Sequence, residues 1–176
     1  IVRSLYDALS TWRRDAGYDG ASWQELEDLL IANNEPAGVT LVVRPGRADV
    51  TEFARRHNAE LGSYSPYAVR MGFGAPSDLV EVRAGDVGVQ DEGSQLVALA
   101  LTRVPLDGPD TRWLDMAAGP GGKAALLAAI GAQAGARLLA SDRSEHRASL
   151  VGRLLDGSPG EHATIVADGR EGSIDS

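Results

Sequence analysis

The chain has 176 residues, of which 43% are hydrophobic and 24% charged, with a formal net charge of −8 and no Cys. This is ordinary globular composition, and the length predicts one domain or slightly more. Without Cys, these residues hold no disulfide scaffold, thiolate metal site or cysteine nucleophile. Three scattered His argue against a zinc centre, so we predict no metal site.

Neither a membrane span nor a signal peptide is evident, because no apolar run approaches the roughly 18 residues that cross a bilayer. The sequence therefore predicts a cytoplasmic protein with no membrane partner. The chain begins at Ile1 rather than Met and stops at Ser176 after a strand-like run, so we expect a fragment of a longer protein.

The negative charge argues against binding nucleic acid by charge neutralisation alone. Within residues 41–70, however, Arg outnumbers the acidic residues, and such a surplus could contact phosphate. For Arg44 and Arg47 the sequence leaves two interpretations open, an RNA contact or an ordinary solvated face.

Two helices are predicted in residues 1–36. Apolar residues of helical spacing mark the first within residues 1–15, and Ser22 with Glu25 forms a capping-box pattern ahead of the second. Pro36 and the Asn pair before it should end the second helix. This segment is expected to be a helical hairpin.

A small α+β module is predicted over residues 37–88. Val39–Val43 and Tyr67–Met71 are typical of strands, Asp49 marks a helix start between them, and Leu79–Val82 indicates a weaker third strand. We expect the aromatic rings of Tyr64 and Tyr67 to belong to the core rather than to stack on bases.

Residues 89–176 follow a different rhythm. A helix over residues 90–101 starts with acidic side chains, and from Arg112 strand, glycine loop, helix, strand, helix and strand alternate. Such alternation predicts a parallel sheet with crossover helices. Its expected elements are residues 112–116, 121–130, 137–141, 145–155 and 163–167, and Trp113 should lie in its core.

The first of these strands leads into the segment WLDMAAGPGGKAALLAA, whose glycines let the backbone approach a ligand closely. The helix that opens at Lys123 presents unpaired N–H groups to a carboxylate or phosphate. A phosphate-binding P-loop is excluded, because Ala117 replaces its first Gly and Ala124 its Ser or Thr.

Asp115, Asp142 and Asp168 each follow one of three successive strands, where open α/β sheets bind ligands. One interpretation is a dinucleotide site, with a G-x-G-x-x-A loop and Asp142 on a ribose. Another is S-adenosyl-L-methionine (SAM), since Asp115 would repel a pyrophosphate but attract an α-amino group. The simplest alternative is that each Asp merely caps the following helix.

The glycine segment, with VQDEGSQLVALAL upstream and VADGR downstream, resembles the Sun (Fmu) family of bacterial ribosomal RNA cytosine-5 methyltransferases. The resemblance implies an α/β chain that carries the first half of the Rossmann-like parallel sheet of a class I SAM methyltransferase, over residues 89–176. Residues 37–88 would be a small RNA-binding subdomain, and residues 1–36 the end of a preceding helical RNA-binding domain. It also implies SAM contacts from Ala117, Ala118, Gly119, Pro120, Gly121, Gly122, Lys123, Asp142 and Asp168.

The family methylates carbon 5 of a cytosine with two Cys, and the resemblance implies that both lie beyond Ser176. Ala117 departs from the family pattern by replacing a Cys of the loop that is not the nucleophile. We therefore expect ribosomal RNA as the substrate, a monomeric complete enzyme, and no catalytic residue in this chain. These 176 residues alone are expected to be inactive and to fold poorly. An NAD-dependent oxidoreductase and a non-catalytic RNA-binding protein are the alternatives.

Overall fold

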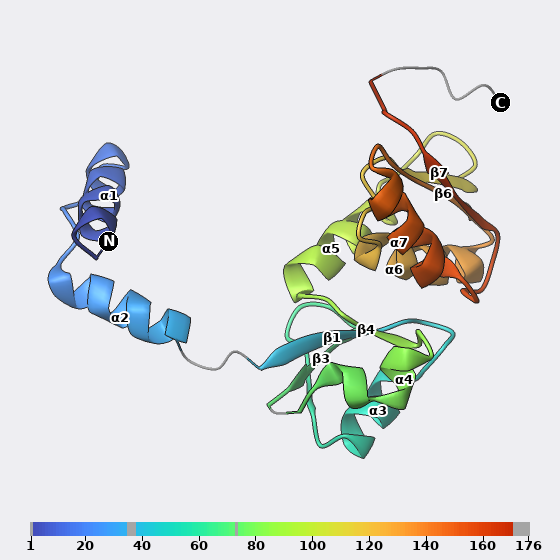
Figure 1. Cartoon of the computed structure of the whole chain (residues 1–176), viewed down its shortest axis with the longest axis horizontal. Coiled ribbons are helices and arrows are strands. Elements are labelled where there is room, and N and C mark those ends of the chain that lie inside the picture. The colour runs from blue at the N-terminus through green and yellow to red at the C-terminus, as the bar shows by residue number, and fades with distance from the viewer. Residues whose placement is uncertain (1, 35–37, 73, 171–176) are drawn as a thin grey trace. The chain divides into compact units, whose positions relative to one another are not determined.

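The structure is a computed structural model that describes residues 2–34, 38–72 and 74–170. It divides into two compact units, Ile1–Ala37 and Gly38–Ser176 (Figure 1). In the described part of the chain, no helix is both long and apolar enough to cross a bilayer.

The first unit consists of two helices, α1 (Val2–Asp15) and α2 (Trp23–Asn34). The predicted capping box is confirmed: Ser22 Oγ accepts from the Glu25 N–H at 3.1 Å, and Glu25 Oε2 accepts from the Ser22 N–H at 2.7 Å. The rings of Tyr6 and Trp23 stack with centroids 4.1 Å apart and join the two helices. Pro36, expected to end the second helix, lies outside the described residues.

The second unit begins with an antiparallel sheet in the order β2-β3-β1-β4. Its strands are β1 (Val39–Val43), β2 (Glu60–Leu61), β3 (Ala68–Met71) and β4 (Val87–Val89). Two helices belong to it, α3 (Val50–Arg56) and the short α4 (Val80–Arg83). Asp49 caps α3 as predicted, because its Oδ1 accepts from the Glu52 N–H at 2.7 Å.

The predicted strand over Leu79–Val82 is wrong. A 3-10 turn (Pro76–Asp78) leads there into α4, and the strand that pairs with β1 on the side opposite β3 is β4. Leu79 and Val82 both pack against one apolar cluster, and their spacing of three suits a helical turn as well as it suits an irregular strand. The β4 segment was missed because it is three residues long and has Gly88 at its centre.

Both faces of β1 are buried. Leu41 and Val43 pack against α3 residues such as Phe53, whereas Val42 belongs to a second cluster with Ala98 and Trp113. The alternation follows from the period of two along a strand. Through Val42, the antiparallel sheet shares the core of the segment that follows it.

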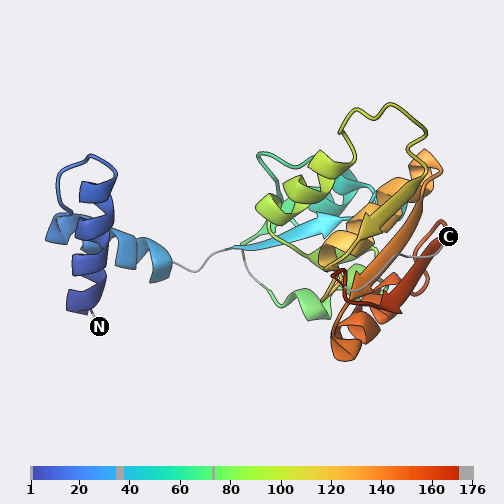
Figure 2. The ribbon, with the colours of Figure 1, turned by 90° about the horizontal axis from the view of Figure 1, so that it is seen from above.

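That segment contains a parallel sheet in the order β5-β6-β7, as the alternating pattern predicted. The strands are β5 (Arg112–Asp115), β6 (Arg137–Asp142) and β7 (His162–Val166). The helices are α5 (Glu92–Leu101), α6 (Gly122–Ala134) and α7 (Glu145–Leu155). Figure 2 shows α6 and α7 on one face of this sheet.

Small side chains bring α6 close to its neighbours. Ala124, Ala125, Ala128 and Ala129 are buried on this helix, and the first three pack with residues of α5, α7 and β6 in one cluster. Trp113 is buried as predicted, and its Nε1 donates to Asp110 Oδ1 at 2.6 Å. The expectation for Tyr64 is wrong, because that side chain is 76% exposed.

Candidate functional site

The candidate site lies where the three parallel strands end. The chain leaves β5 at Asp115, passes through a glycine loop and enters α6, while Asp142 ends β6 and Asp168 follows β7 by two residues. Since parallel strands present their carboxyl ends at one edge, the topology brings the loop and the acids to the same side of the sheet.

The loop is held tightly against α7. Gly121 is the N-cap of α6 with a φ of 115°, and a Cβ there would lie 3.0 Å from Leu154 Cδ2 and 3.3 Å from Val151 Cα. A side chain is therefore disfavoured both by the backbone conformation and by the packing. No side chain caps the start of α6, which leaves its first N–H groups for a ligand.

Asp142 is the anchor of this arrangement and is 3% exposed. Its Oδ2 accepts from the Gly119 N–H at 3.2 Å, and its Oδ1 accepts from the Ser144 N–H at 2.9 Å. Arg147 Nε lies 3.3 Å from Oδ1. The Ser144 N–H first, then the Arg147 charge and the Gly119 N–H, lower the pKa of Asp142, so this carboxylate stays ionised as an acceptor.

Gly119 fits between that carboxylate and α7. A Cβ at Gly119 would meet Arg147 Cβ at 2.6 Å and Asp142 Oδ2 at 2.7 Å. The approach of the loop to Asp142 therefore requires glycine at this position. Asp142 thus fixes the path of the loop, and carboxylate oxygens have further lone pairs for a ligand hydroxyl.

The other two acids are less constrained. Asp168 Oδ1 accepts from the Arg170 N–H at 3.1 Å and from its Nε at 2.9 Å, and this arginine lowers the pKa of Asp168. Asp115 is half-buried, and its Oδ1 accepts from the Ala117 N–H at 3.2 Å.

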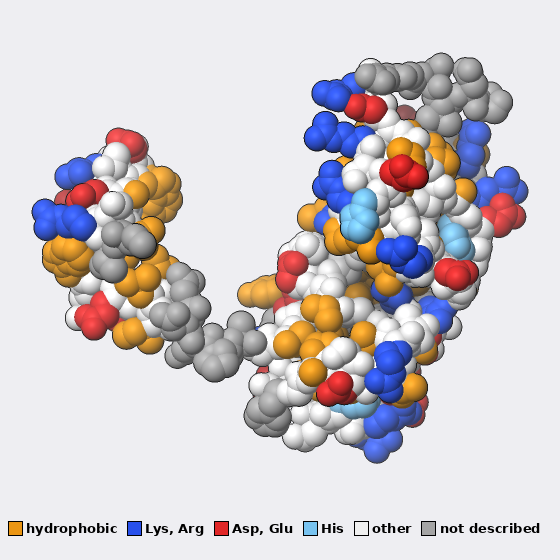
Figure 3. Space-filling model, viewed as in Figure 1, with side chains coloured by type: hydrophobic (Ala, Val, Ile, Leu, Met, Phe, Trp, Pro, Cys, Tyr) orange, Lys and Arg blue, Asp and Glu red, His pale blue; other side chains and the backbone are white. Residues whose placement is uncertain are grey.

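A cavity of about 160 Å³ brings three of the sequence-predicted residues together, namely Ala117, Asp142 and Asp168. The rest of its lining is Met116, Arg143, Arg147, Ala167 and Gly169. Arg143 and Arg147 were missed by sequence reasoning, although both follow Asp142 closely in the segment SDRSEHR. Figure 3 shows Lys and Arg side chains gathered at this end of the second unit.

The remaining predicted residues do not line that cavity. Ala118 is buried in the core, with its N–H donating to Ser141 O at 2.9 Å, and Pro120 is exposed. Gly122 opens α6, and the exposed Lys123 lies near Asp91. Chiefly the Ser94 N–H, and also the Lys123 charge, lower the pKa of Asp91.

Arg44 and Arg47 bind the protein itself, so they do not form the solvated face that one of the two interpretations expected. Arg44 is 2% exposed and donates to Gly85 O, and burial lowers its pKa to about 10. Arg47 Nε lies 2.7 Å from Asp86 Oδ1, and its Nη groups donate to Ala84 O and Gly157 O. Their guanidinium groups are thus engaged inside the unit and do not form a free phosphate-binding surface.

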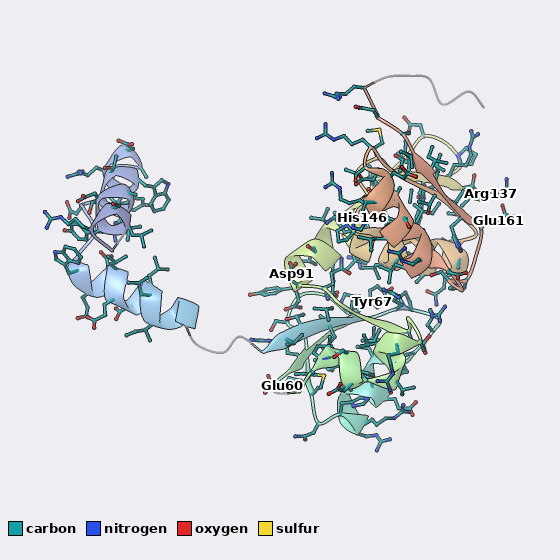
Figure 4. All side chains as sticks on the ribbon, viewed as in Figure 1. Glu60, Tyr67, Asp91, Arg137, His146 and Glu161 are labelled. Atoms are coloured by element: carbon teal, nitrogen blue, oxygen red, sulfur yellow. The ribbon has the colours of Figure 1, made fainter. Side chains whose placement is uncertain are left out.

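A second cavity, of about 390 Å³, lies on the parallel sheet near the opposite strand ends. Arg137 and Glu161, labelled in Figure 4, belong to its lining and form an ion pair with an Nε–Oε2 distance of 2.7 Å. Because ligands of open α/β sheets bind at the carboxyl ends, the site with Asp142 is the better candidate. Among the described residues no group of three or more His, Asp or Glu could hold a metal ion.

Comparison with known proteins connects this geometry to a family. Residues 104–174 match the family model described as 16S rRNA methyltransferase RsmB/F. Two curated proteins of Mycobacterium tuberculosis, MT1451 and Rv1407, carry methyltransferase in their names. Each is 48% identical over 156 residues, which is 89% of this chain and 34% of the relative. The chain therefore spans about a third of the length of these relatives.

Solved structures give the same fold. A methyltransferase homolog protein from Pyrococcus horikoshii superposes with a TM-score of 0.63 and 20% identity, over 82% of this chain and 49% of that one. NSun6 from the same organism, solved with SFG, superposes with a TM-score of 0.65 and 12% identity. The superposition covers 93% of this chain and 64% of that one. These likenesses confirm the predicted α/β fold of a SAM methyltransferase. The family match itself covers residues 104–174, and the relatives named as methyltransferases extend the sequence likeness over 89% of this chain.

Proposed function

We propose that the site at the carboxyl ends of β5, β6 and β7 binds SAM, and that the full-length protein methylates carbon 5 of a cytosine in ribosomal RNA. The observation that carries the proposal is the pairing of an anchored glycine loop with two carboxylates, Asp142 and Asp168, on one cavity. The RsmB/F match supports it, and so does a structural neighbour solved with SFG, a SAM analogue.

The residues present fit this cofactor. Glycine at positions 119 and 121 lets the loop lie close against Asp142 and α7. Asp142 would accept from the ribose hydroxyls and Asp168 from the adenine amino group. The proposed contacts are Ala117, Ala118, Gly119, Pro120, Gly121, Gly122, Lys123, Asp142 and Asp168.

Electrostatics favour SAM over a dinucleotide. Asp115 lies at the loop and is half-buried, where its negative charge would repel a pyrophosphate and attract an ammonium group. The SAM interpretation therefore remains preferred over NAD, and the methyltransferase relatives agree with it.

Bound SAM supplies an electrophilic methyl group. The proposed contact residues of this chain would hold and orient that group, a proximity effect, and Asp142 fixes the loop that they form. Carbon 5 of cytosine is a poor nucleophile until a thiolate adds at carbon 6. Since the chain has no Cys, we propose that this thiolate comes from outside the 176 residues.

For the RNA, we propose residues 37–88 as a small RNA-binding subdomain. Arg55 and Arg70 are exposed there, and Arg143 and Arg147 are exposed at the cofactor site, so cations line both regions. Such side chains contact phosphate without reading sequence.

The test is calorimetric titration of the full-length protein with S-adenosylhomocysteine (SAH) and with NAD, followed by transfer of labelled methyl groups to ribosomal RNA. We expect SAH to bind, NAD not to bind, and the label to appear on carbon 5 of cytosine. Tighter binding of NAD than of SAH would refute the cofactor assignment, and labelling of another base would refute the reaction.

A further inference from the structure

One buried side chain near the glycine loop has no partner. Gln90 is 7% exposed, and neither its Oε1 nor its Nε2 forms a hydrogen bond with any described residue. Gln95, five residues later, is fully buried but satisfied: its Oε1 accepts from Ser65 Oγ at 2.6 Å, and its Nε2 donates to Gln90 O at 2.9 Å. A buried carboxamide with every polar atom unpaired is unusual in a folded protein and calls for a ligand.

The backbone of Gln90 is fixed at the start of α5. Its N–H donates to Thr40 O at 3.1 Å, and its carbonyl accepts from Gln95. The next residue, Asp91, is the N-cap of α5 and is labelled in Figure 4. The position of the free carboxamide is thus set by two elements of the fold.

That carboxamide faces the first residue of α6. A Cβ on Gly122 would lie 3.8 Å from Gln90 Cδ and 3.9 Å from its Nε2. The start of this 13-residue helix has no side-chain cap. Gly122 is half-buried and Asp91 is exposed, so the carboxamide lies directly beneath the surface at the uncapped helix start.

Gln90 faces Gly122, whereas Asp142 bonds to Gly119 at the other end of the loop. Asp142 and Asp168 line the cavity proposed for the ribose and adenine, and Gln90 is not part of that lining. A SAM molecule bound along the loop with its adenosine at these acids would direct its amino-acid head group toward the start of α6, where Gln90 faces Gly122.

We infer that Gln90 binds the amino-acid head group of the cofactor, an inference that rests on the proposed SAM site. Nε2 donates to the carboxylate of the head group, alongside the first N–H groups of α6, and Oε1 accepts from the ammonium. A carboxamide suits this zwitterion because it offers a donor and an acceptor side by side. In the absence of ligand, the unpaired carboxamide destabilises the fold, so the residue binds ligand at the expense of stability.

The experiment compares two ligands on the full-length protein: SAH, which has the amino-acid head group, and 5′-methylthioadenosine, which lacks it. We expect Gln90→Met, of similar length but without hydrogen bonds, to weaken SAH binding about tenfold or more. Binding of 5′-methylthioadenosine should stay within about twofold, because no lost contact involves it. The ligand-free variant should melt at a higher temperature than the wild type, because the unpaired groups are gone.

Gln95→Met is the matched control, since Gln95 is buried in the same segment but bonded only within the protein. Gln95→Met should lower the melting temperature and change the affinities for the two ligands equally. Gln90→Glu is a second variant at the inferred position, which keeps an acceptor but repels the carboxylate of the head group. Equal losses for both ligands in Gln90→Met, or no loss for SAH, would overturn the inference. Failure of the wild type to bind either ligand would instead refute the SAM site itself.

Discussion

At the scale of single residues, Gly119 is the position of the glycine loop where an added side chain would be most crowded. The closest contacts of an added Cβ are 2.6 Å to Arg147 Cβ and 2.7 Å to Asp142 Oδ2. We expect Gly119→Ala to displace the loop, to cost about 1–3 kcal/mol in the free energy of unfolding as overpacking does, and to weaken SAH binding about tenfold or more. Urea unfolding and calorimetric titration would measure both effects.

Gly152→Ala provides the control for that variant. Gly152 lies inside α7, and an added Cβ would meet nothing within 4 Å. Alanine there should raise the free energy of unfolding by about 0.5–1 kcal/mol, because glycine is disfavoured inside helices. If Gly119→Ala were as stable as Gly152→Ala and bound SAH equally well, the close approach of the loop to Asp142 would play no part in binding.

The carboxylate of Asp142 makes a pH-dependent contribution to stability. Its pKa is lowered from the ordinary value of 3.8, chiefly by the Ser144 N–H, so it binds protons less readily in the folded state than in the unfolded state. The contribution is therefore fully present above the unfolded pKa and is lost as the pH falls through the lower folded pKa. We expect wild type to be more stable than Asp142→Asn at pH 7, with the difference shrinking below about pH 4.

Urea unfolding of both proteins between pH 7 and pH 2 would test this expectation. Other carboxyl groups titrate alike in the two proteins and cancel in the difference. Asp107→Asn, at an exposed position before β5, is the comparison for a general loss of negative charge. A difference that stayed constant across this pH range would show that ionisation of Asp142 does not stabilise the loop.

At the scale of elements, α5 is joined to the antiparallel sheet through Gln95. Its side chain bonds to Ser65 Oγ, Leu41 O and Gln90 O. Glu92 adds two bonds, since its Oε1 accepts from the N–H groups of Tyr64 and Ser65 at 2.8 and 2.9 Å. These contacts connect the module of residues 37–88 to the helix that packs on α6.

We expect Gln95→Met to lower the free energy of unfolding by about 2–3 kcal/mol, because buried partners lose their hydrogen bonds. Gln133→Met, at an exposed position of α6, should change it by less than about 0.5 kcal/mol. Denaturant unfolding of the two variants makes the comparison. A similar small effect in both would mean that this network does not hold the two sheets together.

The elements show how far sequence reasoning reaches. The parallel sheet was predictable because β5 and β6 are each followed by a helix, with Ser144 marking the start of α7. Leu79–Val82 was not, since a four-residue segment fits one helical turn and one short strand equally well. The prediction for Tyr64 was wrong for another reason. No sequence pattern shows whether an aromatic ring beside a strand faces the core or the solvent, and this residue is exposed.

The residues of the candidate site also divide into those that the sequence could predict and those that it could not. The glycine loop and the strand-end acids are set by local sequence and topology, so motif spacing could predict Asp142 beside the loop. Gln90 and the internal bonds of Arg44 depend on how distant segments pack, and spacing does not encode that. Arg147 is intermediate, because its place one helical turn beyond Ser144 could have been read from the sequence.

At the scale of the whole molecule, the parallel sheet has an open side within the described residues. There β5 pairs with β6 on one edge only, and Leu114 on β5 is 40% exposed. An unpaired edge beside apolar surface favours association between chains. Relatives more than twice as long as this chain have further sequence that could cover such a surface.

We therefore expect the 176 residues alone to melt at a lower temperature than the full-length protein and to self-associate, as light scattering would show.

We also expect the 176 residues to transfer no methyl group to ribosomal RNA, because a cytosine-5 reaction needs a thiolate and the chain has no Cys. The full-length protein, assayed in parallel with labelled SAM, should be active. Methylation above background by the 176 residues alone would refute the cysteine-dependent mechanism, and a monomeric chain of equal stability would show that the open edge of β5 is tolerated.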